Sequence, residues 1–149
     1  MAASTVRVSQ TVETRTLPNG AVVLLGRFLF ALIFLLAAPS HFSQQTIAFA
    51  TSQGVPLAHF AVPASGILAL LGGLSILLGY RVKFGAWLIV LFLLPVTFMM
   101  HKFWGISDPL AAQAQMVMFL KNIALIGSAL FISQFGAGPL SLDSRSSRR

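Results

Sequence analysis

Residues 60–100 decide the fold of this chain: they read FAVPASGILALLGGLSILLGY, then RVK, then FGAWLIVLFLLPVTFMM. The two outer parts, Phe60–Tyr80 and Phe84–Met100, are continuous apolar runs, long enough to cross a hydrocarbon core of about 30 Å as α-helices. Only the short turn Arg81–Lys83 separates them. A turn of this length joins helices that lie side by side, so the two helices must be antiparallel neighbours.

Two more apolar runs, Ala21–Ala38 and Met116–Phe135, flank this hairpin. In lipid every backbone amide needs a hydrogen-bond partner, which leaves helices or a closed barrel. The runs lack the strict alternation of barrel strands, so helices are favoured. The sequence therefore predicts an all-α protein, an integral membrane four-helix bundle. Its connection His41–His59 is expected to form a short interfacial helix or a loop.

Composition excludes several classes of protein. The chain is 56% hydrophobic and only 9% charged, whereas a soluble domain carries about a quarter of its residues as charges. An ordinary water-soluble enzyme is thereby excluded. The absence of cysteine excludes disulfides, iron–sulfur clusters and thiolate zinc sites. In so apolar a chain, the net charge of +7 indicates orientation in a membrane and not nucleic-acid binding.

The organisation along the chain follows from these runs. Residues 1–19 are polar and lack hydrophobic periodicity, which predicts a disordered cytoplasmic tail. Residues 20–135 form the transmembrane domain, with helices at about 21–38, 60–80, 84–100 and 116–135, and residues 136–149 form a basic cytoplasmic tail. Basic residues predict that both termini are cytoplasmic, because one side of the membrane would hold most of them: Arg7, Arg15, Arg27, Arg81, Lys83, Arg145, Arg148 and Arg149, against Lys102 and Lys121 on the other.

Two cations fall inside the apolar runs, where each costs about 2.5–3.5 kcal/mol at mid-helix. Arg27 is expected to be structural, reaching the headgroups or pairing with Asp143. Lys121 has three alternatives: it reaches the headgroups, pairs with Asp108, or binds an anionic or quinone oxygen.

Polar side chains gather at the outer ends of the predicted helices. His41, His101, Lys121 and Asn122 are candidates for binding a ligand there, and His59 lies at the same level. A quinone needs a donor such as His or Lys at each carbonyl and an apolar slot for its tail, which this cluster could supply. The alternative is that these are interfacial side chains satisfied by water and headgroups. No metal site is predicted, because the histidines lack the HxxxH spacing and only Asp108 stands near them.

The motifs of self-contained enzymes are missing from the sequence. It contains no Gly-rich phosphate loop, no GxSxG elbow and no HExxH motif. Its three acidic residues leave almost no material for paired-carboxylate catalysis. No catalytic residue is therefore assigned.

Several short segments, in this order and spacing, resemble the DoxX family of small four-helix bacterial membrane proteins. They are Gly26-Arg27, Ala37–Phe42, Gly54–Pro56, Leu70–Tyr80, His101–Trp104, Phe119–Asn122 and Gly136–Asp143. The positions carried over by the resemblance are Arg27, His41, His101, Lys121, Asn122 and Asp143. Many relatives have a glutamate three residues before the Gly-Gly of the second helix, where this chain has Ala69.

The resemblance implies a multi-pass protein of the bacterial inner membrane. The family takes its name from a subunit of a thiosulfate:quinone oxidoreductase, and some members are linked to oxidative-stress complexes. The hypothesis is an accessory subunit of a quinone-linked oxidoreductase, in contact with the bilayer and with a protein partner in a redox complex. The alternative is a non-enzymatic component for membrane assembly or lipid handling. A small transporter would need more charge or broken helices at mid-membrane than this sequence has.

Overall fold

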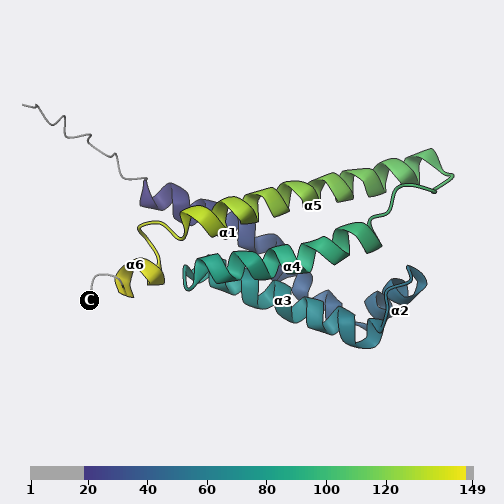
Figure 1. Cartoon of the computed structure of the whole chain (residues 1–149), viewed down its shortest axis with the longest axis horizontal. Coiled ribbons are helices and arrows are strands. Elements are labelled where there is room, and N and C mark those ends of the chain that lie inside the picture. The colour runs from purple at the N-terminus through teal and green to yellow at the C-terminus, as the bar shows by residue number, and fades with distance from the viewer. Residues whose placement is uncertain (1–18, 147–149) are drawn as a thin grey trace, which may run out of the picture.

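The computed structural model describes residues 19–146, and every regular element in that part of the chain is a helix (Figure 1). The elements are α1 (Gly20–Ala37), η1 (Ala38–Phe42), α2 (Gln44–Ser52), α3 (Ala58–Leu78), α4 (Val82–Met100), α5 (Pro109–Phe135) and α6 (Leu142–Ser146). Four spans are long and apolar enough to cross a membrane: α1 with η1, α3, α4 and α5. The predicted all-α membrane bundle is therefore confirmed. Residues 1–18 of the tail predicted at 1–19, and residues 147–149, lie outside the described residues.

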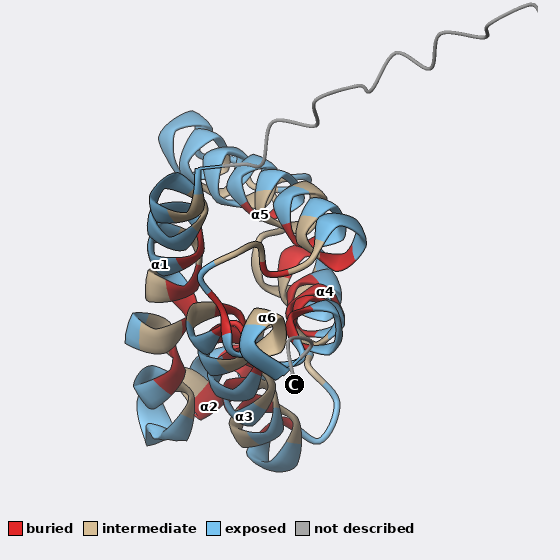
Figure 2. Ribbon diagram, turned by 90° about the vertical axis from the view of Figure 1, so that its left-hand side faces the viewer, coloured by how far each residue is buried: buried red, intermediate tan, exposed pale blue. Residues whose placement is uncertain are grey.

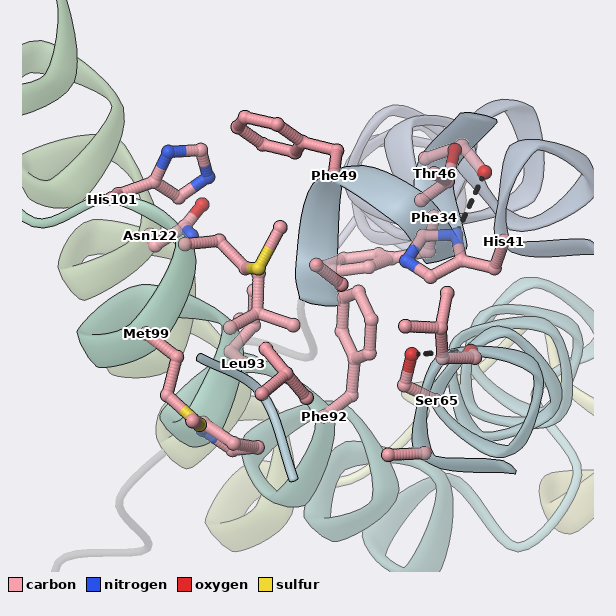
Figure 3. Close-up of a pocket in the computed structure, with 18 of the residues that line it drawn as sticks. Phe34, His41, Thr46, Phe49, Ser65, Phe92, Leu93, Met99, His101 and Asn122 are labelled. Atoms are coloured by element: carbon pink, nitrogen blue, oxygen red, sulfur yellow. Dashed lines mark hydrogen bonds between the residues drawn. The ribbon is translucent and has the colours of Figure 1, made fainter. Parts of the chain in front are cut away.

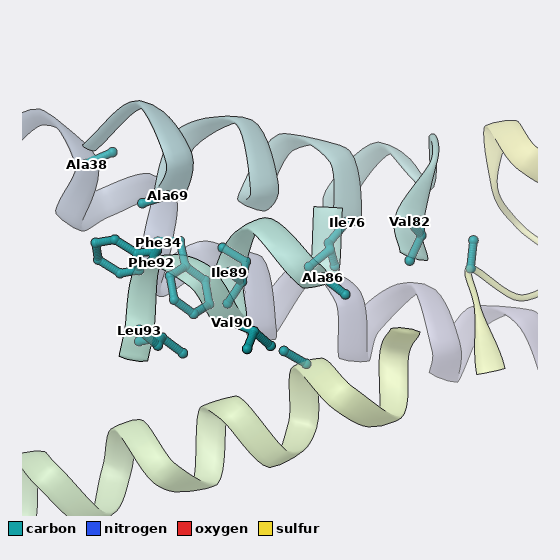
Figure 4. Close-up of a cluster of buried hydrophobic side chains, with 12 residues drawn as sticks. Phe34, Ala38, Ala69, Ile76, Val82, Ala86, Ile89, Val90, Phe92 and Leu93 are labelled. Carbon is teal, nitrogen blue, oxygen red and sulfur yellow. The ribbon is translucent and has the colours of Figure 1, made fainter. Parts of the chain in front are cut away.

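The hairpin of α3 and α4 is the centre of the fold. α3 packs against α1 on one side and against α4 on the other, and α4 packs in turn against α5. The core between them contains Phe34, Ile76, Ile89 and Leu93 (Figure 4). In the described part of the chain α1 and α5 have no extensive contact with each other. The helices thus form a curved row, α1–α3–α4–α5, whose two outer members are α1 and α5 (Figure 2).

Glycines allow α3 and α4 to approach closely. A Cβ atom on Gly85 would lie 2.5 Å from the Cβ of Ser75, and one on Gly72 would lie 2.8 Å from Cδ1 of Ile89. The Ser75 hydroxyl is held in place because it donates a hydrogen bond to the Tyr80 carbonyl in the turn. In a membrane, such small residues let two helices pack closely. The helices then gain more dispersion contacts with each other than they would make with lipid.

The connection between α1 and α3 contains the helix α2. The Ser43 hydroxyl accepts from the Thr46 amide and so caps the start of α2. Ile47 and Ala50 then pack against Ala58 and Val62 of α3. Of the two predicted alternatives, a short helix or a simple loop, the structure has the short helix, which lies against one end of the bundle.

Helix α5 begins at Pro109, ahead of the apolar run that starts at Met116. Asp108 supplies the cap, because its side chain accepts from the Leu110 amide at 3.1 Å, and Pro109 occupies the first turn, where a missing amide donor costs little. The polar extension protrudes beyond the other helices (Figure 1). It places Gln115 opposite the end of α4.

The segment after α5 folds back over the end of the bundle that holds the α3–α4 turn. The Leu140 carbonyl accepts a hydrogen bond from the guanidinium of Arg27, which is buried in α1. The Asp143 carboxylate accepts from the backbone amides of Arg81 and Val82, at 2.8 and 3.2 Å. The segment after α5 thus caps the start of α4 through Asp143 and bonds to α1 through Leu140.

We expect Gly85→Ala to lower the thermal midpoint of the detergent-solubilised protein, because the added methyl group must displace Ser75. Overpacking of this kind costs about 1–3 kcal/mol. Gly127→Ala on α5 is the matched control, since a Cβ there meets no atom within 4 Å. Circular dichroism during heating measures both variants, and equal midpoints would contradict the close approach of α3 and α4.

We expect Asp143→Ala to destabilise the bundle by about 1 kcal/mol, the usual cost of removing a helix cap. The exposed Ser146→Ala in the same short helix provides the control. Limited proteolysis should also cut Asp143→Ala faster within residues 136–146, because the segment loses its attachment to the turn. Wild-type resistance in that variant would show that the carboxylate does not hold the segment in place.

Candidate functional site

A cavity of about 380 Å³ lies among the helices, at the end of the bundle opposite the α3–α4 turn. Side chains from α1, η1, α2, α3, α4 and α5 line it, and most of them are apolar (Figure 3). All four candidate ligand-binding residues are among them: His41, His101, Lys121 and Asn122. The structure thus places the predicted residues in one cavity, although they come from three different elements.

His41 is fixed in η1 by packing on both sides. Its ring meets the ring of Phe92 edge-on, with centroids 5.5 Å apart, and a Cβ on Gly66 would lie only 2.6 Å from the Cβ of His41. The Nδ1 atom lies 3.1 Å from the Ala37 carbonyl oxygen. The other ring nitrogen points into the cavity (Figure 3).

His101 follows the last residue of α4, and its ring is held by a residue of α5. Its Nδ1 lies 3.0 Å from Oε1 of Gln115, and its other ring nitrogen is directed toward the cavity (Figure 3). Gln115 belongs to the polar extension of α5. The two imidazoles therefore reach the cavity from opposite sides, each with one nitrogen engaged and one facing inward.

Asn122 is the most unusual polar group of the site. Its residue is 4% exposed, and its carboxamide makes no hydrogen bond with any other described residue. Among the described residues, the fully enclosed side-chain atoms without a partner are Nε and Nη1 of Arg27, so the polar atoms of Asn122 are open to the cavity. A buried amide on the wall of a cavity, without a partner among the described residues, is typical of a site that receives a ligand or a water molecule.

Lys121 occupies the rim of the cavity. The residue is exposed, and its Nζ lies 3.4 Å from the sulfur of Met118. Asp108, the carboxylate predicted as one alternative partner, instead caps α5. A cation at the rim can meet a ligand or a lipid headgroup as it enters.

The structure adds lining residues that the sequence did not single out. Thr46 and Phe49 come from α2, and Ser65 and Phe92 come from the middle of α3 and α4. Gln115, which holds His101 without lining the cavity, was not predicted because the expected helix began at Met116. Its one signal was the Asp-Pro pair at residues 108–109, which is a helix-start pattern.

The predicted ion pair and the position of the family's glutamate both lie away from the cavity. Arg27 and Asp143, predicted as a structural ion pair, both lie at the opposite end, where the carboxylate interacts with the Arg27 charge through space. Ala69 is fully buried in the core, so no carboxylate enters the bundle at that position. Within residues 19–146 no three side chains of His, Cys, Asp or Glu lie together as metal ligands would.

Comparison with known proteins identifies relatives of this chain. An inner membrane protein of Escherichia coli (strain K12), YphA, is 26% identical to it over 100 residues, which is 67% of this chain and 71% of the relative. No solved structure matches the chain significantly. A family model described as DoxX matches residues 22–102, from the start of α1 to the end of α4. His41 and His101 lie inside the matched region, while Lys121 and Asn122 follow it. Because the match covers more than half of the sequence, the chain belongs to the DoxX family.

Proposed function

We propose that this protein binds a lipid-soluble quinone in the cavity, as an accessory subunit of a quinone-linked oxidoreductase of the membrane. The observation that carries the proposal is the unpartnered carboxamide of Asn122, buried beside an apolar cavity that also receives two imidazoles. A ring with polar oxygens at its edge would supply the missing partners. Its apolar body would fill the rest of the cavity.

The position of the cavity suits a ligand that arrives from the bilayer. Ile33 and Phe34 of α1 bound it on one side, and Asn122 and Leu125 of α5 on the other. Because α1 and α5 have no extensive contact, an isoprenoid tail can leave between them into the surrounding lipid.

An accessory role fits the lack of acid–base groups. The chain has three acidic residues in all, and the two in the described part, Asp108 and Asp143, do not line the cavity. No cysteine is present to carry electrons. A chain with this equipment can hold and orient the quinone or its quinol, while a protein partner exchanges electrons with it.

The alternative function is lipid handling or membrane assembly without a redox role. It is favoured by Lys121 and Phe49, two exposed residues that both line the cavity. A cation above an apolar cavity can hold an anionic headgroup whose acyl chain lies inside.

We also propose that the protein resides in the bacterial inner membrane with both termini in the cytoplasm. Arg27, Arg81, Lys83 and Arg145 lie toward the end with the α3–α4 turn, and Lys102 and Lys121 lie toward the other. This asymmetry supports a cytoplasmic location of the first end. The name of the Escherichia coli relative supports the inner membrane.

The first test is to purify the protein in mild detergent and analyse an organic extract by mass spectrometry. We expect a quinone in stoichiometric amount, and its loss in Asn122→Leu, which removes the amide. The empty Asn122→Leu protein should be about as stable as wild type, because the amide makes no hydrogen bond with the described residues that the substitution would break. Ser133→Ala is the control, since Ser133 is equally buried on the same helix but bonded to the Leu130 carbonyl.

The outcomes of this test separate the two functions. An extract holding only bulk phospholipid, unchanged in Asn122→Leu, would contradict quinone binding and favour lipid handling. A phospholipid enriched in wild type and lost in Lys121→Ala would do the same.

The orientation is testable because the natural chain has no cysteine. We expect Ser107→Cys, in the exposed connection between α4 and α5, to react with a membrane-impermeant maleimide in cells whose outer membrane alone is permeable. Ser146→Cys in α6 should react only after the inner membrane is opened. The reverse pattern would place the termini outside the cytoplasm.

A further inference from the structure

The orientation of the two imidazoles distinguishes between the two redox forms of a quinone. We propose that the cavity binds the reduced, dihydroxy form, the quinol, in preference to the quinone. The inference rests on the proposed function, because it concerns which form of that ligand the same cavity selects.

His41 carries the argument, because its Nδ1 can only be the donor. A backbone carbonyl oxygen accepts hydrogen bonds and never donates them, so the contact with Ala37 places the proton on Nδ1. In a neutral imidazole the other nitrogen is then an acceptor. This acceptor, Nε2, is the atom that points into the cavity (Figure 3).

His101 presents the same kind of atom. Oε1 of Gln115 is an acceptor, so Nδ1 of His101 donates to it and Nε2 keeps its lone pair. This Nε2 also faces the cavity (Figure 3). Two lone pairs therefore enter the cavity from separate sides.

A quinone and a quinol respond differently to these lone pairs. The carbonyl oxygens of a quinone only accept hydrogen bonds. Each would therefore place a lone pair against the lone pair of an imidazole Nε2, which is repulsive. The hydroxyl groups of a quinol donate and can bond to both imidazoles. Asn122 does not discriminate, because its carboxamide offers a donor and an acceptor to either form.

The other side-chain donors at the cavity are the hydroxyls of Thr46 and Ser65 and the ammonium of Lys121, and they do not reverse this preference. The Ser65 hydroxyl donates to the Val62 carbonyl, and the Thr46 hydroxyl donates to Ser43, whose own proton goes to the Ser40 carbonyl. Lys121 is an exposed residue whose Nζ is engaged with the sulfur of Met118, at 3.4 Å. No carboxylate is among the lining residues to take up or supply a proton. The preference for the quinol thus follows from two engaged Nδ1 atoms.

The test measures the dissociation constants of a benzoquinone with a decyl tail and of its quinol. The full chain in detergent is dialysed against each form under anaerobic conditions, at about pH 8 where free imidazole is neutral. We expect the quinol to bind about tenfold more tightly for each imidazole that it engages, since one hydrogen bond is worth about that factor. Equal affinities, or tighter binding of the quinone, would overturn the proposal while leaving quinone binding intact.

Variants show whether the imidazoles set this preference. Gln115→Leu frees Nδ1 of His101, so the ring can adopt the other tautomer, and His41→Gln places a donor and an acceptor where only an acceptor stood. Each should reduce the ratio of quinol to quinone affinity by about tenfold, with the quinone bound as well as before or better. Gln113→Leu is the control, because Gln113 is exposed on the same stretch of α5. A loss of both affinities in parallel would show a structural role only, and a failure of wild type to bind either form would overturn the proposed function as well.

Discussion

The close approach of α3 and α4 is the constraint on which the rest of the structure depends. Lipid tails are as apolar as a protein core, so burying an apolar side chain between helices gains no hydrophobic free energy. Helices therefore associate only where they pack better against each other than against lipid. Gly72 and Gly85 provide such a place, and the turn beyond them keeps the two helices antiparallel. The other two spanning helices then attach to opposite sides of this pair, α1 to α3 and α5 to α4. The cavity exists because the attached helices do not close on each other.

Much of the fold could be predicted from the sequence, because the physics of lipid leaves few choices. Continuous apolar runs must be helices, and the short Arg81–Lys83 turn fixes the neighbours. The start of α5 could not be found in this way, since residues such as Gln113 and Gln115 interrupt the apolar pattern while a cap at Asp108 extends the helix. Hydropathy reports where a chain can lie in lipid, whereas the bounds of a helix depend on its caps.

The candidate site was predictable as a list of residues but not as a chemical environment. His41, His101, Lys121 and Asn122 share one end of the predicted bundle, so their proximity follows from topology. The missing partner of Asn122 and the engaged nitrogen of each imidazole depend on distances of a few ångströms. Those distances are set by contacts between distant segments, such as Gly66 against His41 and Gln115 against His101. Sequence spacing within one helix carries no information about them.

The bond between Arg27 and Leu140 has a consequence for biogenesis. The two residues are 113 positions apart, and all four spanning helices lie between or around them. When α1 enters the bilayer during synthesis, the carbonyl that will receive its guanidinium has not yet been translated. Until then the cation must remain near the headgroups or in contact with the insertion machinery, because an isolated charge at depth costs several kcal/mol. Docking of the segment after α5 therefore follows the synthesis of all four spanning helices, and it gives the Arg27 guanidinium its carbonyl partner.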